Sequence, residues 1–62
     1  SARLVALLAE MQSLQAKLNA DIAAVQEKKI PYKEQMRQLT DLQAAFRVRK
    51  LALVDEISAL NK

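Results

Sequence analysis

The side chains that could act as acids, bases or nucleophiles are few and scattered along the chain. The sequence contains neither histidine nor cysteine, and its seven carboxylates do not cluster. Asp55 and Glu56 are adjacent, but neighbouring residues on a helix point about 100° apart and do not converge on one substrate. The serine hydroxyls have no candidate base beside them except solvated lysines; they belong to Ser1, Ser13 and Ser58. We therefore expect that this protein is not an enzyme.

Cofactor and metal chemistry also lacks its usual residues. A structural zinc site needs thiolate or imidazole ligands, and the chain has neither. Phosphate-cradling loops need glycine, and the chain has none. The one phenol, Tyr32, is better explained as a core or turn residue than as a catalytic group. We expect no cofactor and no metal.

Basic residues form the remaining chemical pattern. The net charge of +3 and the pI near 9.6 would permit binding to nucleic acid or to an acidic partner. However, the excess is small, the arginines within residues 46–51 spread around a helix, and no aromatic platform accompanies them. Nucleic-acid contact is therefore the alternative function, either for this chain or for a protein that it dimerises. The candidate contacts are Lys28, Lys29, Lys33, Arg37, Arg47, Arg49 and Lys50.

The elements that would position these residues are helices. Hydrophobic residues make up 52% of the chain, mostly alanine and leucine, and strong helix formers fill most other positions. There are no glycine-containing turn dipeptides and no alternating runs of β-branched residues. The composition predicts an all-α fold.

Large apolar residues recur at every seventh position along the whole chain. This spacing is typical of a helix that packs along a seam, and we designate the series position a of a heptad. The series is Leu4, Met11, Leu18, Val25, Tyr32, Leu39, Phe46, Leu53 and Leu60.

The second seam position, d, is less uniform. It is apolar at Leu7, Leu14 and Leu42, but polar at Asp21, Lys28, Gln35, Arg49 and Glu56. Position e supplies further apolar residues, namely Leu8, Ile22, Met36 and Ile57. The resulting stripe is wider than a two-stranded seam requires, which favours a helix with two neighbours, as in a bundle.

Pro31 raises the question of a hairpin or a continuous kinked helix. The unbroken series at position a favours the kinked helix, as part of a coiled-coil dimer. The hairpin is favoured by three polar d positions near Pro31, by lysines in a last helical turn at 28–29, and by proline at a first helical position. Glu34 would then lie in a first turn, where a carboxylate is stabilising. We predict helices over about 2–29 and 32–61.

Charge placement supports the hairpin. Folding the chain near residue 30 places residue i opposite residue 61 − i. No acid has a base four residues later, so the charges are expected to pair between helices. The predicted neighbours are Glu10 with Arg49 and Lys50, Arg3 with Asp55 and Glu56, and Lys17 with Asp41.

A chain of 62 residues buries too little surface to be comfortably stable alone. Without disulfides or metals, self-association or a helical partner remains, and we expect a homodimeric four-helix bundle whose core is formed by the apolar residues at a, d and e. The expected function is oligomerisation or protein–protein interaction. A candidate second interface comprises Val5, Val48 and Leu51.

The longest run without a polar residue, from Leu4 to Ala9, is far shorter than the roughly 20 residues of a membrane span. We therefore expect no membrane span, and the absence of cysteine agrees with a cytoplasmic location. The chain begins with serine rather than methionine, which suggests processing or excision from a longer protein.

Overall fold

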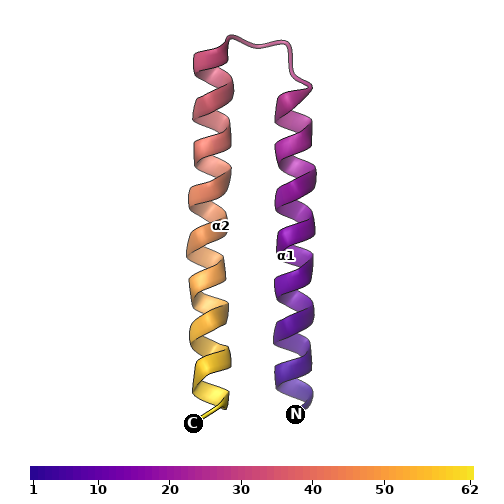
Figure 1. Cartoon of the computed structure of the whole chain (residues 1–62), viewed down its shortest axis with the longest axis vertical. Coiled ribbons are helices and arrows are strands. Elements are labelled where there is room, and N and C mark those ends of the chain that lie inside the picture. Colours follow the sequence, from indigo (N-terminus) through magenta and orange to yellow (C-terminus); the bar gives the residue numbers. More distant parts are fainter.

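The structure, a computed structural model, describes residues 1–62 and contains two helices, α1 (Ala2–Gln26) and α2 (Tyr32–Leu60). The helices run antiparallel, with residues 27–31 joining them at one end and both termini at the other end (Figure 1). The hairpin measures 47 × 15 × 8 Å along its principal axes. The all-helical prediction is confirmed, and the helices pack against each other instead of continuing as a rod. Neither helix is long and apolar enough to cross a membrane.

The first helix ends earlier than predicted. Its start is capped by Ser1, whose hydroxyl accepts a hydrogen bond of 3.1 Å from the Leu4 backbone amide. Its end lies at Gln26, so Lys28 and Lys29 lie beyond the last turn rather than inside it. Pro31 disfavours the helical conformation at residue 30, so α1 has to end before that residue. Residues 27–31 then cross from the end of α1 to the start of α2.

The turn is built without any left-handed residue. No residue has a positive φ, and the last amides bond backward instead: Lys28 N–H donates to the Val25 carbonyl at 3.1 Å. Pro31 is the N-cap of α2, at φ −57° and ψ 147°. It therefore precedes the first helical residue, Tyr32, whereas the sequence suggested that Pro31 would itself be the first helical residue. Glu34 lies in the first turn of α2, as predicted.

The helices meet along the predicted a and d positions. Leu7, Val25 and Leu53 are buried. Leu7 lies near the start of α1 and Leu53 near the end of α2, so both belong to the end of the hairpin that holds the termini, whereas Val25 lies at the end of α1 beside the turn. The half-buried apolar residues of the seam are Leu4, Met11, Leu14, Leu18, Leu39, Leu42 and Phe46, with Ile22 and Ile57 at its edge.

Four residues of the predicted oligomerisation core are exposed in the single hairpin: Leu8, Tyr32, Met36 and Leu60. Tyr32 belongs to position a, but the turn places it at the tip, where α1 has already ended. Leu8 and Met36 belong to position e, beside the seam. The hairpin therefore closes a narrow a/d seam and leaves the wider stripe uncovered.

Candidate interaction surface

The seam divides the surface of the hairpin into two flanks. Because the helices are antiparallel, positions c and g of both helices lie on one side of the seam, and positions b and e lie on the other. The grooves agree with this division. Ala24, Gln38 and Ala45, all at position g, line one groove together, whereas Gln43 and Lys50, both at position e, line another.

The first side is named the bridged flank because polar contacts cross the seam there. Arg3 pairs with Glu56, and Arg49 donates to Glu10 at 2.6 Å between nitrogen and oxygen. Both contacts join α1 to α2, and both were predicted from the register of the hairpin. They hold the open half of the hairpin in alignment.

The third predicted bridge, between Lys17 and Asp41, is wrong. Lys17 instead pairs with Asp21 at 2.8 Å, and Asp41 accepts from Arg37 at 3.1 Å. Each partner lies four residues away on the same helix, so a side chain reaches it along one turn without crossing the seam. The local partner wins because less side-chain freedom is lost in reaching it.

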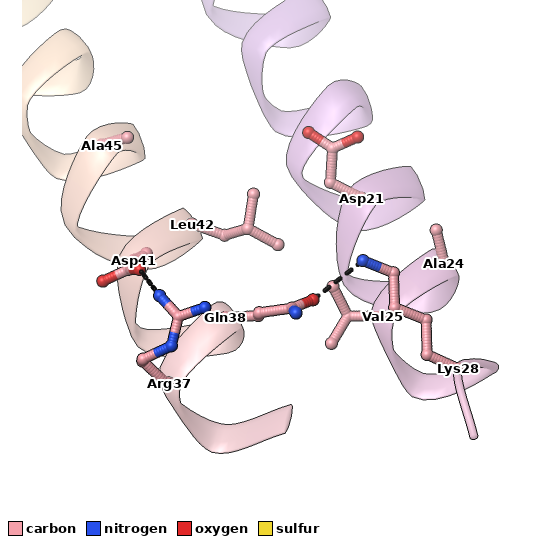
Figure 2. Close-up of a pocket in the computed structure, with 9 residues that line it drawn as sticks. All are labelled: Asp21, Ala24, Val25, Lys28, Arg37, Gln38, Asp41, Leu42 and Ala45. Atoms are coloured by element: carbon pink, nitrogen blue, oxygen red, sulfur yellow. Dashed lines mark hydrogen bonds and ion pairs between the residues drawn. The ribbon is translucent and has the colours of Figure 1, made fainter. Parts of the chain in front are cut away.

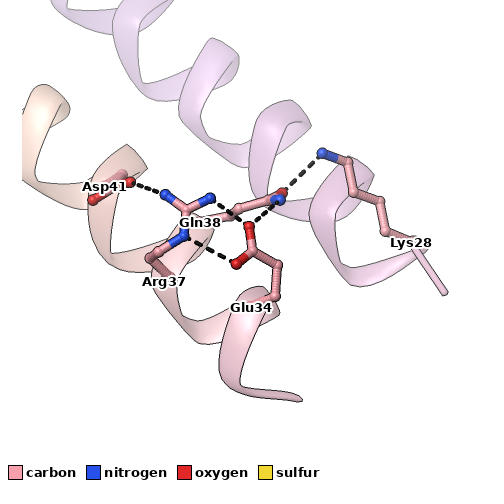
Figure 3. A network of polar contacts seen from close by, with 5 residues as sticks. All are labelled: Lys28, Glu34, Arg37, Gln38 and Asp41. Atoms are coloured by element: carbon pink, nitrogen blue, oxygen red, sulfur yellow. Dashed lines mark hydrogen bonds and ion pairs between the residues drawn. The ribbon is translucent and has the colours of Figure 1, made fainter. Parts of the chain in front are cut away.

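A network of polar side chains lies on the bridged flank near the turn (Figure 3). The guanidinium of Arg37 binds both carboxylate oxygens of Glu34, and it also donates to Asp41. Gln38 donates to Glu34 at 3.2 Å and accepts from the Lys28 ammonium at 2.8 Å, which carries the network across to the end of α1. Hydrogen bonds from Arg37 and then Gln38 lower the pKa of Glu34 from 4.5 to about 2. The same contact raises the pKa of Arg37.

Beneath this network lies a shallow groove of about 570 Å³ with an apolar floor (Figure 2). The floor is made by Ala24, Val25, Leu42 and Ala45. The charged groups around it are already paired with one another or with neighbours on their own helix. No three His, Cys, Asp or Glu side chains come close enough to hold a metal ion. The groove offers neither a free base nor a ligand set.

The second side is named the open flank because no hydrogen bond or ion pair between side chains crosses the seam there. The only side-chain hydrogen bond on it, from Gln15 to Asn19 at 3.0 Å, stays within α1. All seven acids of the chain occupy positions c, d or g, so the open flank carries none. It comprises Val5, Leu8, Gln12, Gln15, Asn19, Ile22, Gln26, Lys33, Met36, Thr40, Gln43, Arg47, Lys50, Val54 and Ile57.

The structure separates the seven candidate basic contacts into two groups. Lys28, Arg37 and Arg49 bond to other side chains on the bridged flank. Lys29, Lys33, Arg47 and Lys50 have no ion pair; the last three lie on the open flank and Lys29 lies in the turn beside it.

Lys50 differs from its prediction. Its ammonium lies 5.8 Å from the centre of the Phe46 ring, whereas the register had directed it, like Arg49, toward Glu10. One residue further along a helix is a rotation of about 100°, which moves Lys50 from the bridged flank to the open flank. Only Arg49 is therefore placed to reach Glu10.

The three residues of the candidate second interface lie at three different heptad positions. Val5 lies on the open flank, whereas Val48 is at position c and Leu51 at position f of α2, where Leu51 lines the same groove as Gln43 and Lys50. All three are exposed in the hairpin. The role of these residues as a second interface stays a prediction.

Sequence reasoning missed the glutamines that complete the tip. Gln38 connects Lys28 to Glu34, and Gln35 donates across the seam to the Val25 carbonyl at 3.4 Å. The four-residue spacing of Glu34 and Gln38 was a usable signal. The contact of Gln35 has no such signal, because it depends on where the α1 backbone ends.

No protein-family model, no curated protein and no solved structure matches this chain.

Proposed function

We propose that the chain is a self-association module in which two hairpins pack into a homodimeric four-helix bundle. The observation that supports this most is the surface area. The hairpin exposes 4841 Å² for a mass of 7.0 kDa, whereas a compact folded monomer of this mass exposes about 4,000 Å². The excess of about 800 Å² equals the area that each partner buries in a standard protein–protein interface.

The distribution of apolar side chains agrees with the area. Only three of the 62 residues are buried, which is too small a core for a stable domain. Leu8, Met36 and Val54 are large, apolar and exposed beside the seam. A second hairpin against them would complete the a, d and e stripe as the core of a bundle.

The test is the mass and shape of the chain in solution. Light scattering coupled to size exclusion should give a compact dimer of about 14 kDa at micromolar concentration, twice the chain mass. Its thermal midpoint should rise with protein concentration, because folding and association are linked. A folded monomer with a midpoint independent of concentration would overturn the proposal.

A second candidate function is contact with a polyanion such as nucleic acid. It is favoured by four of the candidate cations, which have neither an ion pair nor a side-chain hydrogen bond, and three of them lie on a flank that carries no acid. Titration with duplex DNA and with RNA at about 50 mM salt would reveal such contacts, since phosphate binding is strongest at low salt. If binding appears, replacing Arg47 and Lys33 by alanine should weaken it at least tenfold. Absence of binding at this salt concentration excludes this function for these residues.

A further inference from the structure

We propose that the open flank is the surface through which two hairpins associate, with their tips at opposite ends of the dimer. This inference rests on the self-association proposed above and assigns it a face and an orientation. The occupant of the open flank is a second copy of the same chain. A standard interface buries about 800 Å² on each partner, which is close to the excess surface area of the hairpin over a compact monomer.

The bridged flank is a poor surface for such an interface. Most of its charged groups already bond across the seam or along one helix, as in Arg49 with Glu10 and Arg37 with Glu34. Covering these groups with a second copy would remove water from ion pairs that are now exposed. Glu27 and Asp55, the acids at position c without an ion pair, carry the same charge, so those of a second copy would not compensate them. The bridged flank therefore stabilises the fold of one hairpin and remains in solvent.

The α1 side of the open flank is suited to meet its own copy. All four charged residues of α1, namely Arg3, Glu10, Lys17 and Asp21, are ion-paired and lie on the other side of the seam or in it. The open flank of α1 is therefore neutral. A two-fold interface requires a patch that complements itself, and a neutral patch meets its copy without repulsion.

The residues of this neutral face can also contact the same residues of a second copy. Val5, Leu8 and Ile22 offer apolar area near its two ends, whereas Gln12 and Gln15 lie between them. A carboxamide both donates and accepts hydrogen bonds, so it can pair with the same group on a second copy. The flank thus contains apolar contacts at both ends and adaptable polar contacts in the middle.

The cations of the open flank decide the orientation. Lys29 and Lys33 lie at the tip of the hairpin, at the end remote from the termini. If the two tips lay together, four ammonium groups would gather at one end of the dimer. With opposite tips, the two pairs are separated by about the 47 Å length of the hairpin, which is several Debye lengths at 0.15 M salt.

The remaining cations do not distinguish the two orientations. Arg47 and Lys50 lie midway along α2, where their long stems can cover apolar surface while their charged groups remain at the rim. In the opposite-tip dimer, Ile22 and Met36 near the tip of one copy meet Leu8 and Val54 near the open end of the other. Apolar residues then face apolar residues at both ends of the interface.

The first test compares two exposed valines on different flanks. Val5→Glu lies on the open flank and Val48→Glu at position c, with parent side chains 67% and 73% exposed. Val5→Glu should raise the Kd of the dimer by about 10- to 100-fold, since one charge enters the interface twice. Val48→Glu should change the Kd less than about threefold, as expected of a surface substitution. Sedimentation equilibrium measures both.

A second pair guards against misfolding of one variant. Met36→Glu alters the open flank at a side chain that is 41% exposed, and Ala20→Glu is its control at an exposed position c of α1, on the bridged flank. The Kd should rise for Met36→Glu and stay within about threefold for Ala20→Glu. If Val48→Glu and Ala20→Glu dissociate the dimer instead, the open flank is not the interface, although self-association stands. A wild-type chain that is monomeric overturns the proposed function itself.

The orientation is tested with a spin label at the tip. The native chain has no cysteine, so Glu27→Cys provides one labelling site per copy on an exposed residue of the turn. Opposite tips predict a distance between labels comparable to the 47 Å length of the hairpin. A distance below about 25 Å, or two helix diameters, would place the tips together and overturn this orientation.

Discussion

The bridged and open flanks are made by the same two helices but use their polar residues differently. On the bridged flank, acids and bases alternate, and most of them bond to one another, twice across the seam in its open half. On the open flank, acids are absent and the bases Lys33 and Arg47 have no ion pair. The ion pairs of the bridged flank join the two helices of one hairpin, and the open flank is the surface that we propose for contact with a second copy.

This difference teaches that exposure alone does not identify a contact surface. Val5 and Val48 are almost equally exposed, yet Val5 lies on the neutral, acid-free side of α1, whereas Val48 lies at position c of α2, on the side of the seam that holds the acids. A partner must strip water from whatever it covers, so the nature of the neighbouring polar groups matters as much as the apolar area. Substitutions in the seam should therefore cost more stability than substitutions on either flank, and the two flanks should respond differently from each other.

The largest effect is expected in the seam itself. Leu53 is completely buried, so Leu53→Ala should lower the free energy of unfolding by about 2–5 kcal/mol. Val48→Ala removes an exposed side chain and should cost less than about 0.5 kcal/mol. Urea denaturation at one fixed protein concentration compares them. Equal losses would show that the two helices do not pack along this seam.

Salt should act on the two flanks in opposite directions. Raising sodium chloride from about 0.1 M to about 1 M shortens the Debye length from about 10 to 3 Å. The loss of unfolding free energy caused by Arg49→Gln should shrink at the higher salt concentration, because the cross-seam pairs are exposed and screened. The dimer Kd of the native chain should decrease several-fold, because repulsion between the open-flank cations is screened. A Kd that rises with salt would contradict the assignment of those cations to the interface.

Two arginines separated by one residue compare the flanks directly. Arg49→Gln removes the bridge to Glu10 and should lower the free energy of unfolding by about 0.2–1 kcal/mol, the usual range for an exposed ion pair. Arg47→Gln removes no ion pair and should leave the stability of the hairpin unchanged. Both are measured by urea denaturation at the same high protein concentration, at which the chain stays associated, so that differences in dissociation do not contribute. A larger loss for Arg47→Gln would reverse the assignment of the flanks.

The smallest effect concerns the tip network. The pKa of Glu34 is lowered from 4.5 to about 2, so the folded state favours the ionised carboxylate. Its stabilising contribution should be fully present above pH 4.5 and disappear as the pH falls toward 2. Carboxyl carbon shifts in an NMR titration report this directly. Arg37→Gln should return the pKa toward its ordinary value; an unchanged pKa would show that Arg37 is not the cause.

The sequence predicted the pairs of Arg3 with Glu56 and Glu10 with Arg49, because a helix of known rise and a fold near residue 30 determine the register. It placed Lys17 with the wrong partner, because two acids lay within reach and only side-chain geometry distinguished them. The same ambiguity affected Lys50, which follows the correctly assigned Arg49. Spacing along the sequence predicts which residues lie at the same height in the two helices. Predicting on which side of the seam a side chain lies also requires the rotation of each helix about its axis.

The sequence by itself determined that the chain is helical and that a heptad stripe runs along it, because composition and period are local properties. It left the hairpin and the rod in competition, since the series at position a passes unbroken through the residues of the turn. Only the tertiary structure decided where α1 ends, which charges bond to each other and which flank remains open. These outcomes depend on distances of a few ångströms between residues remote in sequence, because hydrogen bonds weaken steeply beyond that range.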